Sequence, residues 1–134
     1  MRFLVAALIC LMSGPVSAND DPKLEDFLWV ARPIVVFADS GSDPAVAEQL
    51  QYLEQQRNEL DERDVVILVD TDPAANSALR QKLRPRGFMF VLVSKEGEIL
   101  LRKPKPVTTR EIIRQIDRTP LRRQEIQNNR GSSS

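Results

Sequence analysis

The run Ile-Val-Val-Phe-Ala at positions 34–38 decides the fold, because five consecutive apolar residues, three of them β-branched, are typical of a strand buried on both faces. A second run of this kind, Val-Val-Ile-Leu-Val, occupies positions 65–69. Between them, Asp43 and Pro44 predict a helix start, with a capping carboxylate followed by proline, and apolar residues recur at helical spacing up to Arg63. Two strands joined by such a helix are expected to lie parallel.

Two further elements are predicted after the second strand. The Asp-Pro pair at positions 72–73 repeats the cap-then-proline pattern and predicts a helix that ends at Leu83. Residues 88–93 and 99–102 are mostly apolar and flank the polar turn 95–98. They therefore predict an antiparallel hairpin.

A last helix is predicted after the hairpin. Thr108 and Glu111 fit a capping box at its start, and Pro120 ends it. Its inward face carries three isoleucines, Ile112, Ile113 and Ile116. The full order, β-α-β-α-β-β-α, predicts an α/β domain with a four-stranded mixed sheet flanked by helices, which is the order of the thioredoxin fold.

One segment carries this likeness at the level of individual residues. Residues 86–98 resemble a thioredoxin segment that reads Arg-Gly, an aliphatic residue, Pro-Thr, an apolar strand and Lys-x-Gly. Met89 stands at the position of that family's cis-proline, and loop 39–43 stands where thioredoxins carry Trp-Cys-Gly-Pro-Cys. The loop contains no cysteine, so the resemblance implies a thioredoxin-like fold without the two residues that perform thiol chemistry.

A closer resemblance covers residues 27–126. It is carried by positions 33–38, 43–44, 49–50, 63–66 and 95–97, and above all by Ile-Asp-Arg-Thr-Pro-Leu-Arg-Arg-Gln-Glu-Ile at 116–126. Over this range the chain resembles a family of exported bacterial proteins known only as a domain of unknown function, with a thioredoxin- or peroxiredoxin-like fold. The family's domain is also similar to one in extracellular sushi-repeat proteins. The resemblance implies fold and export rather than a particular chemistry.

Composition excludes several classes of enzyme. The chain has 134 residues, 42% of them hydrophobic, which suffices for a single domain. It has no histidine, so Ser-His-Asp and Cys-His catalysis and imidazole metal ligands are excluded. We identify no catalytic, cofactor-binding or metal-binding residue, and we expect no thiol redox activity.

The first eighteen residues have the pattern of a signal peptide. Arg2 is followed by an apolar run, residues 3–12, and by small residues up to Ala18. The lone cysteine, Cys10, lies in the apolar run, so cleavage after Ala18 leaves a periplasmic or extracellular chain that has no cysteine.

The mature chain is expected to have three parts. A polar leader covers residues 19–26, the folded domain covers residues 27–126, and a disordered tail covers residues 127–134. Within the domain, the apolar cluster at positions 27–30 is expected to pack over the edge of the core.

Four aspartates follow the two parallel strands. Because the carboxyl ends of adjacent parallel strands meet at one edge of a sheet, a hard cation could bind there. Asp43 and Asp72 are each explained as helix caps, which leaves Asp39 and Asp70 for a carboxylate- or metal-dependent activity.

Charge is divided between the two halves of the chain. Residues 19–83 hold 6 basic and 14 acidic side chains, whereas residues 84–134 hold 12 basic and 5 acidic ones. Arginines recur every four residues at positions 110, 114, 118 and 122, and we assign the binding surface to Arg110, Arg114, Arg122 and Arg123. The plainer interpretation is a solvated face partly paired with the acidic first helix.

Three functions are compatible with these features. The first is an exported binding module for an anionic protein or membrane surface; nucleic acid is disfavoured because export removes the chain from it. The second is the carboxylate- or metal-dependent activity at Asp39 and Asp70. The third is a structural module that self-associates through its acidic and basic halves, and the sequence does not fix the oligomeric state.

The signal pattern generates the first testable prediction. In the native host the mature chain should begin at Asn19, because Ala18 supplies the small residue before the cleaved bond. The intact mass of the protein from envelope and medium measures this. A full-length species that stays in the cytosol would contradict it.

Overall fold

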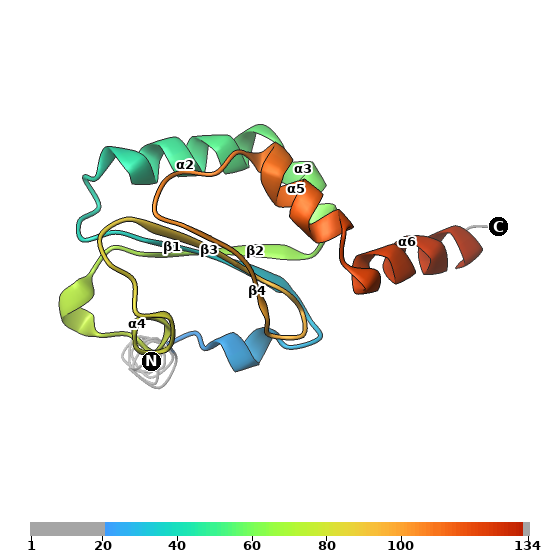
Figure 1. Ribbon diagram of the computed structural model, residues 1–134, viewed down its shortest axis with the longest axis horizontal. Helices are drawn as coiled ribbons and strands as arrows, with labels where there is room; N and C mark the ends of the chain where they lie inside the picture. The colour runs from blue at the N-terminus through green and yellow to red at the C-terminus, as the bar shows by residue number, and fades with distance from the viewer. Residues whose placement is uncertain (1–20, 133–134) are drawn as a thin grey trace, which may run out of the picture.

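The computed structural model describes residues 21–132, so the predicted signal peptide lies outside the described residues. It is built on one four-stranded sheet with strand order β2-β1-β3-β4 (Figure 1). The strands are β1 (Arg32–Phe37), β2 (Val65–Asp70), β3 (Met89–Val93) and β4 (Ile99–Lys103). Strand β1 pairs parallel with β2 and antiparallel with β3, and β3 pairs antiparallel with β4. The predicted α/β fold with a mixed sheet is confirmed.

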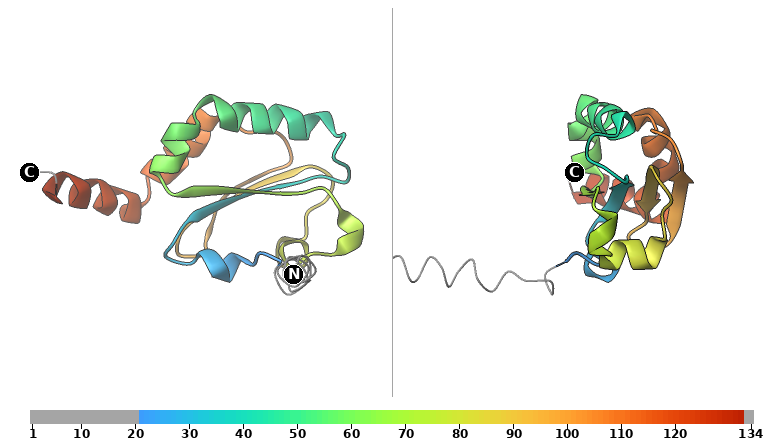
Figure 2. Two further views of the ribbon diagram at one scale, coloured as in Figure 1. Left: turned by 180° about the vertical axis from the view of Figure 1, so that it is seen from behind. Right: turned by 90° about the vertical axis from the view of Figure 1, so that its left-hand side faces the viewer.

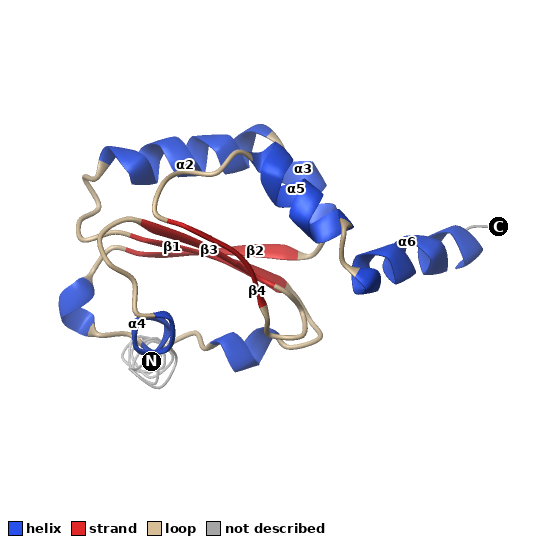
Figure 3. Ribbon diagram, in the orientation of Figure 1, coloured by secondary structure: helices blue, strands red, loops and turns tan. Residues whose placement is uncertain are grey.

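Helices cover both faces of the sheet (Figure 3). The helices are α2 (Pro44–Gln55), α3 (Arg57–Glu62), α4 (Ala78–Leu83), α5 (Thr109–Asp117) and α6 (Pro120–Ser132), with 3₁₀ turns η2 (Leu24–Phe27) and η3 (Pro73–Ala75). The views from behind and from the side place α2, α3 and α5 on one face and η2 and α4 on the other, while α6 extends away from the body (Figure 2).

Strand β1 forms the centre of both cores, because all six of its residues are buried. Ile34 and Val36 pack against one layer, with Leu53, Leu60, Ile112 and Ile116 from the helices. Val35 and Phe37 point to the opposite layer, with Leu79 and Leu83 of α4. The continuous apolar run therefore serves two hydrophobic layers at once, as predicted for a strand buried on both faces.

The first predicted helix is interrupted. Asp43 caps α2 as expected, since its Oδ1 accepts from the Ala45 N–H at 2.9 Å. The helix does not run unbroken to Arg63, because Gln56 leaves helical geometry at φ −133°, ψ 46° and separates α2 from α3.

The second predicted helix begins later than expected. Asp72 and Pro73 start only the 3₁₀ turn η3, which ends where Asn76 enters the left-handed region. Ser77 caps α4 instead, accepting from the Arg80 N–H at 3.2 Å. A serine cap close to the helix therefore replaces the Asp-Pro start that the sequence favoured.

Both ends of the domain differ from expectation. Residues 127–132, expected to be disordered, belong to α6, which Thr119 caps by accepting from the Arg122 N–H. At the other end, Trp29 and Val30 are exposed rather than packed over the core. Among residues 21–132 we find no helix whose length and apolar character would let it span a bilayer.

A buried glutamine joins α2 to the segment before α5. The Gln49 side chain is fully buried; its amide N–H donates to the Val107 carbonyl at 2.8 Å, and its Oε1 accepts from the Val107 N–H at 2.7 Å. Thr109 adds a hydrogen bond from its hydroxyl to the Tyr52 carbonyl. These bonds fix the start of α5 against α2.

The glutamine pair predicts a stability effect. Gln49→Leu should lower the free energy of unfolding by about 2–4 kcal/mol, because two buried backbone groups of Val107 lose their partners. Gln51→Leu, an exposed substitution on the same helix, should change it by no more than about 0.5 kcal/mol. Urea unfolding of both variants measures this, and equal midpoints would contradict it.

Candidate functional site

The loop after β1 is the segment for which the resemblance to thioredoxins implies the position of their thiols. It holds two serines whose hydroxyls lie 2.8 Å apart, and the Ser40 Oγ also accepts from the Ser42 N–H at 3.1 Å. These contacts satisfy the serines locally, and within residues 21–132 neither hydroxyl bonds to a carboxylate or another base that could activate it. Asp39 is exposed in the same loop.

Asp70, the second residue of the proposed carboxylate site, is bound on both oxygens. Its Oδ1 accepts from the Arg80 Nε at 2.8 Å and from the Asp72 N–H at 3.2 Å, and its Oδ2 accepts from the Ser77 hydroxyl. Burial works against ionisation of this carboxyl, but the bonds from Ser77 and Arg80 outweigh it and lower its pKa.

Arg80 explains why Asp70 is held in this way. The guanidinium also donates to the Ala38 carbonyl at 2.7 Å and lies over the Phe37 ring, 5.4 Å from its centroid. It therefore ties α4 to the ends of β1 and β2. Within residues 21–132, no three carboxylates, histidines or cysteines are grouped so that they could hold a metal ion.

The opposite end of the sheet carries a cluster of charges, which we call the ionic cluster; its cations are buried and its carboxylates are partly exposed. At its centre is Glu125 of α6, which accepts from Lys95 at 2.8 Å, from Arg32 at 3.3 Å and from Arg122 at 3.4 Å. Arg32 opens β1 and is only 1% exposed, and it also donates to the Arg63 carbonyl at 2.8 Å. The carboxylate thus compensates a guanidinium that is out of reach of water.

A second part of the ionic cluster joins α3 to α5. Arg63 binds Asp117 through two parallel hydrogen bonds, at 2.9 and 3.1 Å, and binds Glu59 at 3.0 Å. The bond to Asp117 is the largest contribution that raises the pKa of Arg63, against the opposing effect of burial. Lys95 completes the arrangement by donating to Asp64 at 2.8 Å.

The contacts at the centre of the ionic cluster shift the pKa values of Lys95 and Glu125. Burial opposes the charged form of both Lys95 and Glu125. Their hydrogen bonds outweigh it, so that the pKa of Lys95 is raised, by Asp64 and Glu125, and the pKa of Glu125 is lowered, by Lys95 and Arg32. Both groups are therefore held in their charged forms over the neutral range.

The predicted contact arginines fall into two classes. Arg110, Arg114 and Arg123 are exposed, as is Arg118, and no carboxylate of the described residues forms an ion pair with any of the four. Arg122 does not belong to this surface: it is only 5% exposed, and its guanidinium lies 3.4 Å from Glu125 and 3.7 Å from Asp117. The docking of α6 turns Arg122 inward and Arg123 outward.

Sequence reasoning missed the centre of the ionic cluster. Arg32 is separated from the apolar run of β1 by Pro33 alone, and Lys95 and Glu125 look like ordinary surface charges in the sequence. A signal was available, since the segments at 63–66, 95–97 and 116–126 that carry the family resemblance each contribute charged residues to the cluster.

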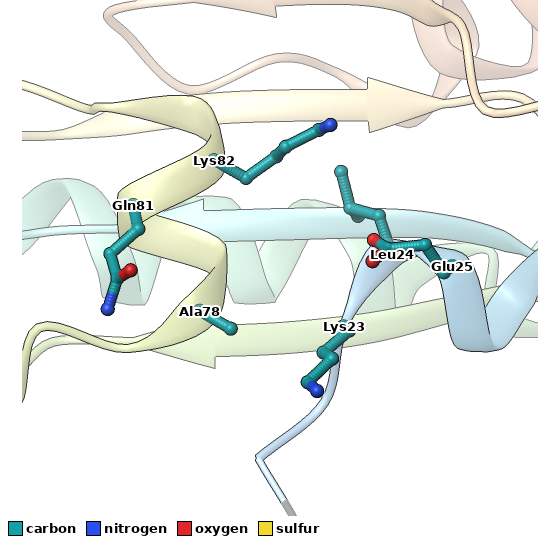
Figure 4. Close-up of a pocket in the computed structure, with 6 residues that line it drawn as sticks. All are labelled: Lys23, Leu24, Glu25, Ala78, Gln81 and Lys82. Atoms are coloured by element: carbon teal, nitrogen blue, oxygen red, sulfur yellow. The ribbon is translucent and has the colours of Figure 1, made fainter.

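A surface depression lies between η2 and α4, lined by Lys23, Leu24, Glu25, Ala78, Gln81 and Lys82. The close-up shows Lys23 and Lys82 pointing in different directions, so their ammonium groups do not converge on one ligand position (Figure 4). We therefore assign no function to it.

Comparison with known proteins identifies both family and fold. The family described as "Domain of unknown function (DUF4174)" matches residues 23–125. A comparison with curated proteins gives no match.

Solved structures extend this comparison. The reduced 2-Cys peroxiredoxin of Plasmodium vivax is similar with a TM-score of 0.57 and 14% identity, over 87% of this chain and 91% of that one. Thioredoxin-2 of the malaria parasite has a TM-score of 0.53 and 17% identity, over 66% and 84% of the two chains. Chloroplastic thioredoxin z has a TM-score of 0.51 and 25% identity, over 66% and 80%. The likeness concerns the thioredoxin fold.

The ionic cluster predicts a pH-dependent contribution to stability. Glu125→Gln should lower the free energy of unfolding at pH 7 by about 1.5–3 kcal/mol, because hydrogen bonds from charged donors lose their ionised acceptor. Since the pKa of Glu125 is lower in the folded chain, its contribution is complete above the unfolded pKa of about 4.3 and is lost as the pH falls through the folded pKa.

Urea unfolding from pH 7 to pH 3 measures this effect. The difference between wild type and Glu125→Gln should shrink below about pH 4.3. Glu98→Gln, at an exposed carboxylate outside the ionic cluster, should stay within about 0.5 kcal/mol of wild type throughout. A difference that stays constant with pH would contradict the assignment.

Proposed function

The chain belongs to the family described as a domain of unknown function, DUF4174, and we propose that it is an exported binding module without thiol chemistry, which holds an anionic partner on arginines of helices α5 and α6. The observation that carries the proposal is the group of four exposed arginines, Arg110, Arg114, Arg118 and Arg123, that lack ion-pair partners among the described residues. Thiol chemistry has no support, since the only cysteine precedes the predicted cleavage point.

The spacing of these arginines supports a binding role over a merely solvated face. Arg110 and Arg114 are four residues apart on α5, so they share a helix face and repel each other by about 0.2–0.5 kcal/mol. The acidic first helices do not relieve this repulsion, because the carboxylates that pair there do so with Arg57 and Arg63. An anionic partner would relieve it.

The platform beneath the arginines supports the same proposal. Helix α5 is fixed by the buried side chains of Ile112 and Ile116 and by the bond between Asp117 and Arg63, and α6 is fixed by Glu125. The exposed arginines thus project from a rigid base, which lowers the conformational entropy lost on binding.

The chemistry of the partner follows from charge and compartment. We propose export with cleavage after Ala18, which brings the domain to the periplasm or the exterior and away from nucleic acid. The partner is an anionic protein or membrane surface, steered by the positive half of the chain. The resemblance to exported bacterial proteins and to a domain of sushi-repeat proteins supports this proposed location.

The carboxylate alternative loses its support. Both oxygens of Asp70 already accept hydrogen bonds, from Arg80 and Ser77, so a cation there would have to displace the contacts that join α4 to the sheet. Self-association through opposite charges is distinguished from partner binding by the oligomeric state of the purified chain.

The arginine surface predicts a loss of binding without a loss of fold. Arg110→Gln with Arg114→Gln should reduce capture of envelope partners, or binding to anionic vesicles, and should flatten its salt dependence, because screening acts over a Debye length of about 8 Å at physiological ionic strength. The melting temperature should be unchanged or slightly higher, since like charges are removed.

A matched control removes two charges elsewhere. Lys82→Gln with Arg86→Gln changes two exposed cations at and after α4, which covers the other face of the sheet, and should leave binding intact. Binding is measured by capture yield and vesicle sedimentation at low and high salt. If both double variants bind like wild type at every salt concentration, the arginines are a solvated face only.

A further inference from the structure

An apolar patch is exposed where the chain enters the sheet. Three consecutive residues between η2 and β1 form it: Leu28, Trp29 and Val30, with 39%, 67% and 66% of their surfaces exposed. Trp29 is the only tryptophan of the chain. A contiguous exposed patch with a large aromatic side chain is typical of an interaction site rather than of an ordinary surface.

The backbone holds Trp29 in a disfavoured conformation. Its φ is +63°, in the left-handed region that a bulky aromatic residue rarely adopts. The Trp29 N–H donates to the Lys95 carbonyl at 2.8 Å, and the Ala31 N–H donates to the Phe27 carbonyl at 3.0 Å. The main chain therefore determines that the indole points outward, and the indole is not needed to fill the core. Non-glycine residues held in this way occur preferentially at functional sites.

The neighbouring turn supports the patch from one side. A Cβ atom on Gly97 would lie 3.1 Å from Leu28 Cδ2, so the loop packs directly on the turn between β3 and β4 (Figure 1). The Lys95 side chain of that turn points into the ionic cluster, where Glu125 and Asp64 bind it. The patch thus rests on a turn that is tied to the ionic cluster.

Four acidic residues lie near this patch, two in the turn that precedes it and two in the turn that supports it. Glu25 and Asp26 lie one turn before Trp29, and Glu96 and Glu98 lie in the supporting turn. All four are exposed, and none forms an ion pair within residues 21–132. The ammonium of Lys95 is occupied within the cluster and does not neutralise them.

We propose that this patch docks a partner protein through a segment that presents apolar side chains flanked by lysine or arginine. The apolar groups would bury Trp29 and Val30, a flanking cation would stack on the indole face, and further cations would meet the four carboxylates. A lipid surface is disfavoured, because these carboxylates would repel anionic headgroups. The patch is separate from the arginine surface and has the opposite charge preference, so the two proposals succeed or fail independently.

Binding of the full mature chain to an array of randomised peptides tests this proposal. The expected binders are enriched in Lys and Arg next to apolar residues, and Trp29 emission should shift to shorter wavelength when such a peptide is added. Trp29→Gly should weaken the affinity for such peptides tenfold or more. The melting temperature should stay unchanged or rise by a few degrees, because glycine relieves the positive φ.

Charge-reversal variants test whether the carboxylates near Trp29, rather than the acidic character of the whole chain, favour basic peptides. Glu96→Lys with Glu98→Lys should weaken peptide binding, whereas Asp39→Lys, at an exposed carboxylate beyond the other end of β1, should not. Arg110→Gln with Arg114→Gln should also have no effect, which distinguishes this surface from the arginine surface.

Four results would overturn the proposal. The first is an array without enrichment for basic and apolar residues, and the second is binding that survives Trp29→Gly. The third is a blue shift of Trp29 with vesicles of zwitterionic lipid but not with peptides, which would assign the patch to a membrane. The fourth is a concentration-dependent dimer that Trp29→Gly dissolves, which would assign it to a second copy of the chain.

Discussion

The guanidinium of Arg32 is the constraint on which the rest of the structure depends. It opens the central strand, is almost completely buried, and needs a carboxylate that water cannot replace. Glu125 supplies it from the C-terminal helix, 93 residues further along the chain, and at the same time binds Lys95 and Arg122. This single carboxylate joins the start of β1, the turn after β3 and helix α6.

The two ends of β1 differ in what they expose. At the carboxyl end, where the thioredoxin fold places its redox residues, the serines bond to each other and Asp70 is held by Arg80. At the amino end, the ionic cluster supports two exposed surfaces of opposite character: the arginines of α5 and α6, and the patch around Trp29 with four carboxylates near it. The proposed functions lie at and around this second end, because at the first end the serines and Asp70 already bond to neighbouring groups.

Much of the fold could be predicted from the sequence, because strands β1 and β2 are uninterrupted apolar runs and Asp43 and Thr108 are strong capping signals. The failures have physical reasons. Ser77 rather than Asp72 caps α4, because Asn76 adopts a left-handed conformation that ends the turn η3 before the helix begins. Trp29 is exposed because a backbone bond to Lys95, invisible in the sequence, determines its direction.

The arginine surface was predicted only in part, because long-range contacts decide which arginines are exposed. The spacing of arginines identifies a helix face, but the side of α6 that faces the sheet is fixed by Glu125, which separates buried Arg122 from exposed Arg123. Pairing between residues so distant in sequence requires the tertiary structure, since each residue alone looks like a surface charge.

Hydrogen exchange of the α6 backbone amides tests the central claim, that Glu125 docks this helix. In the wild-type chain at neutral pH, amides of the turn that contains Glu125 should be protected. In Glu125→Gln they should exchange about tenfold faster or more, while β1 and β3 keep their protection. Exchange of α6 that is equally fast in both proteins, or equally slow, would show that the helix does not depend on the ionic cluster.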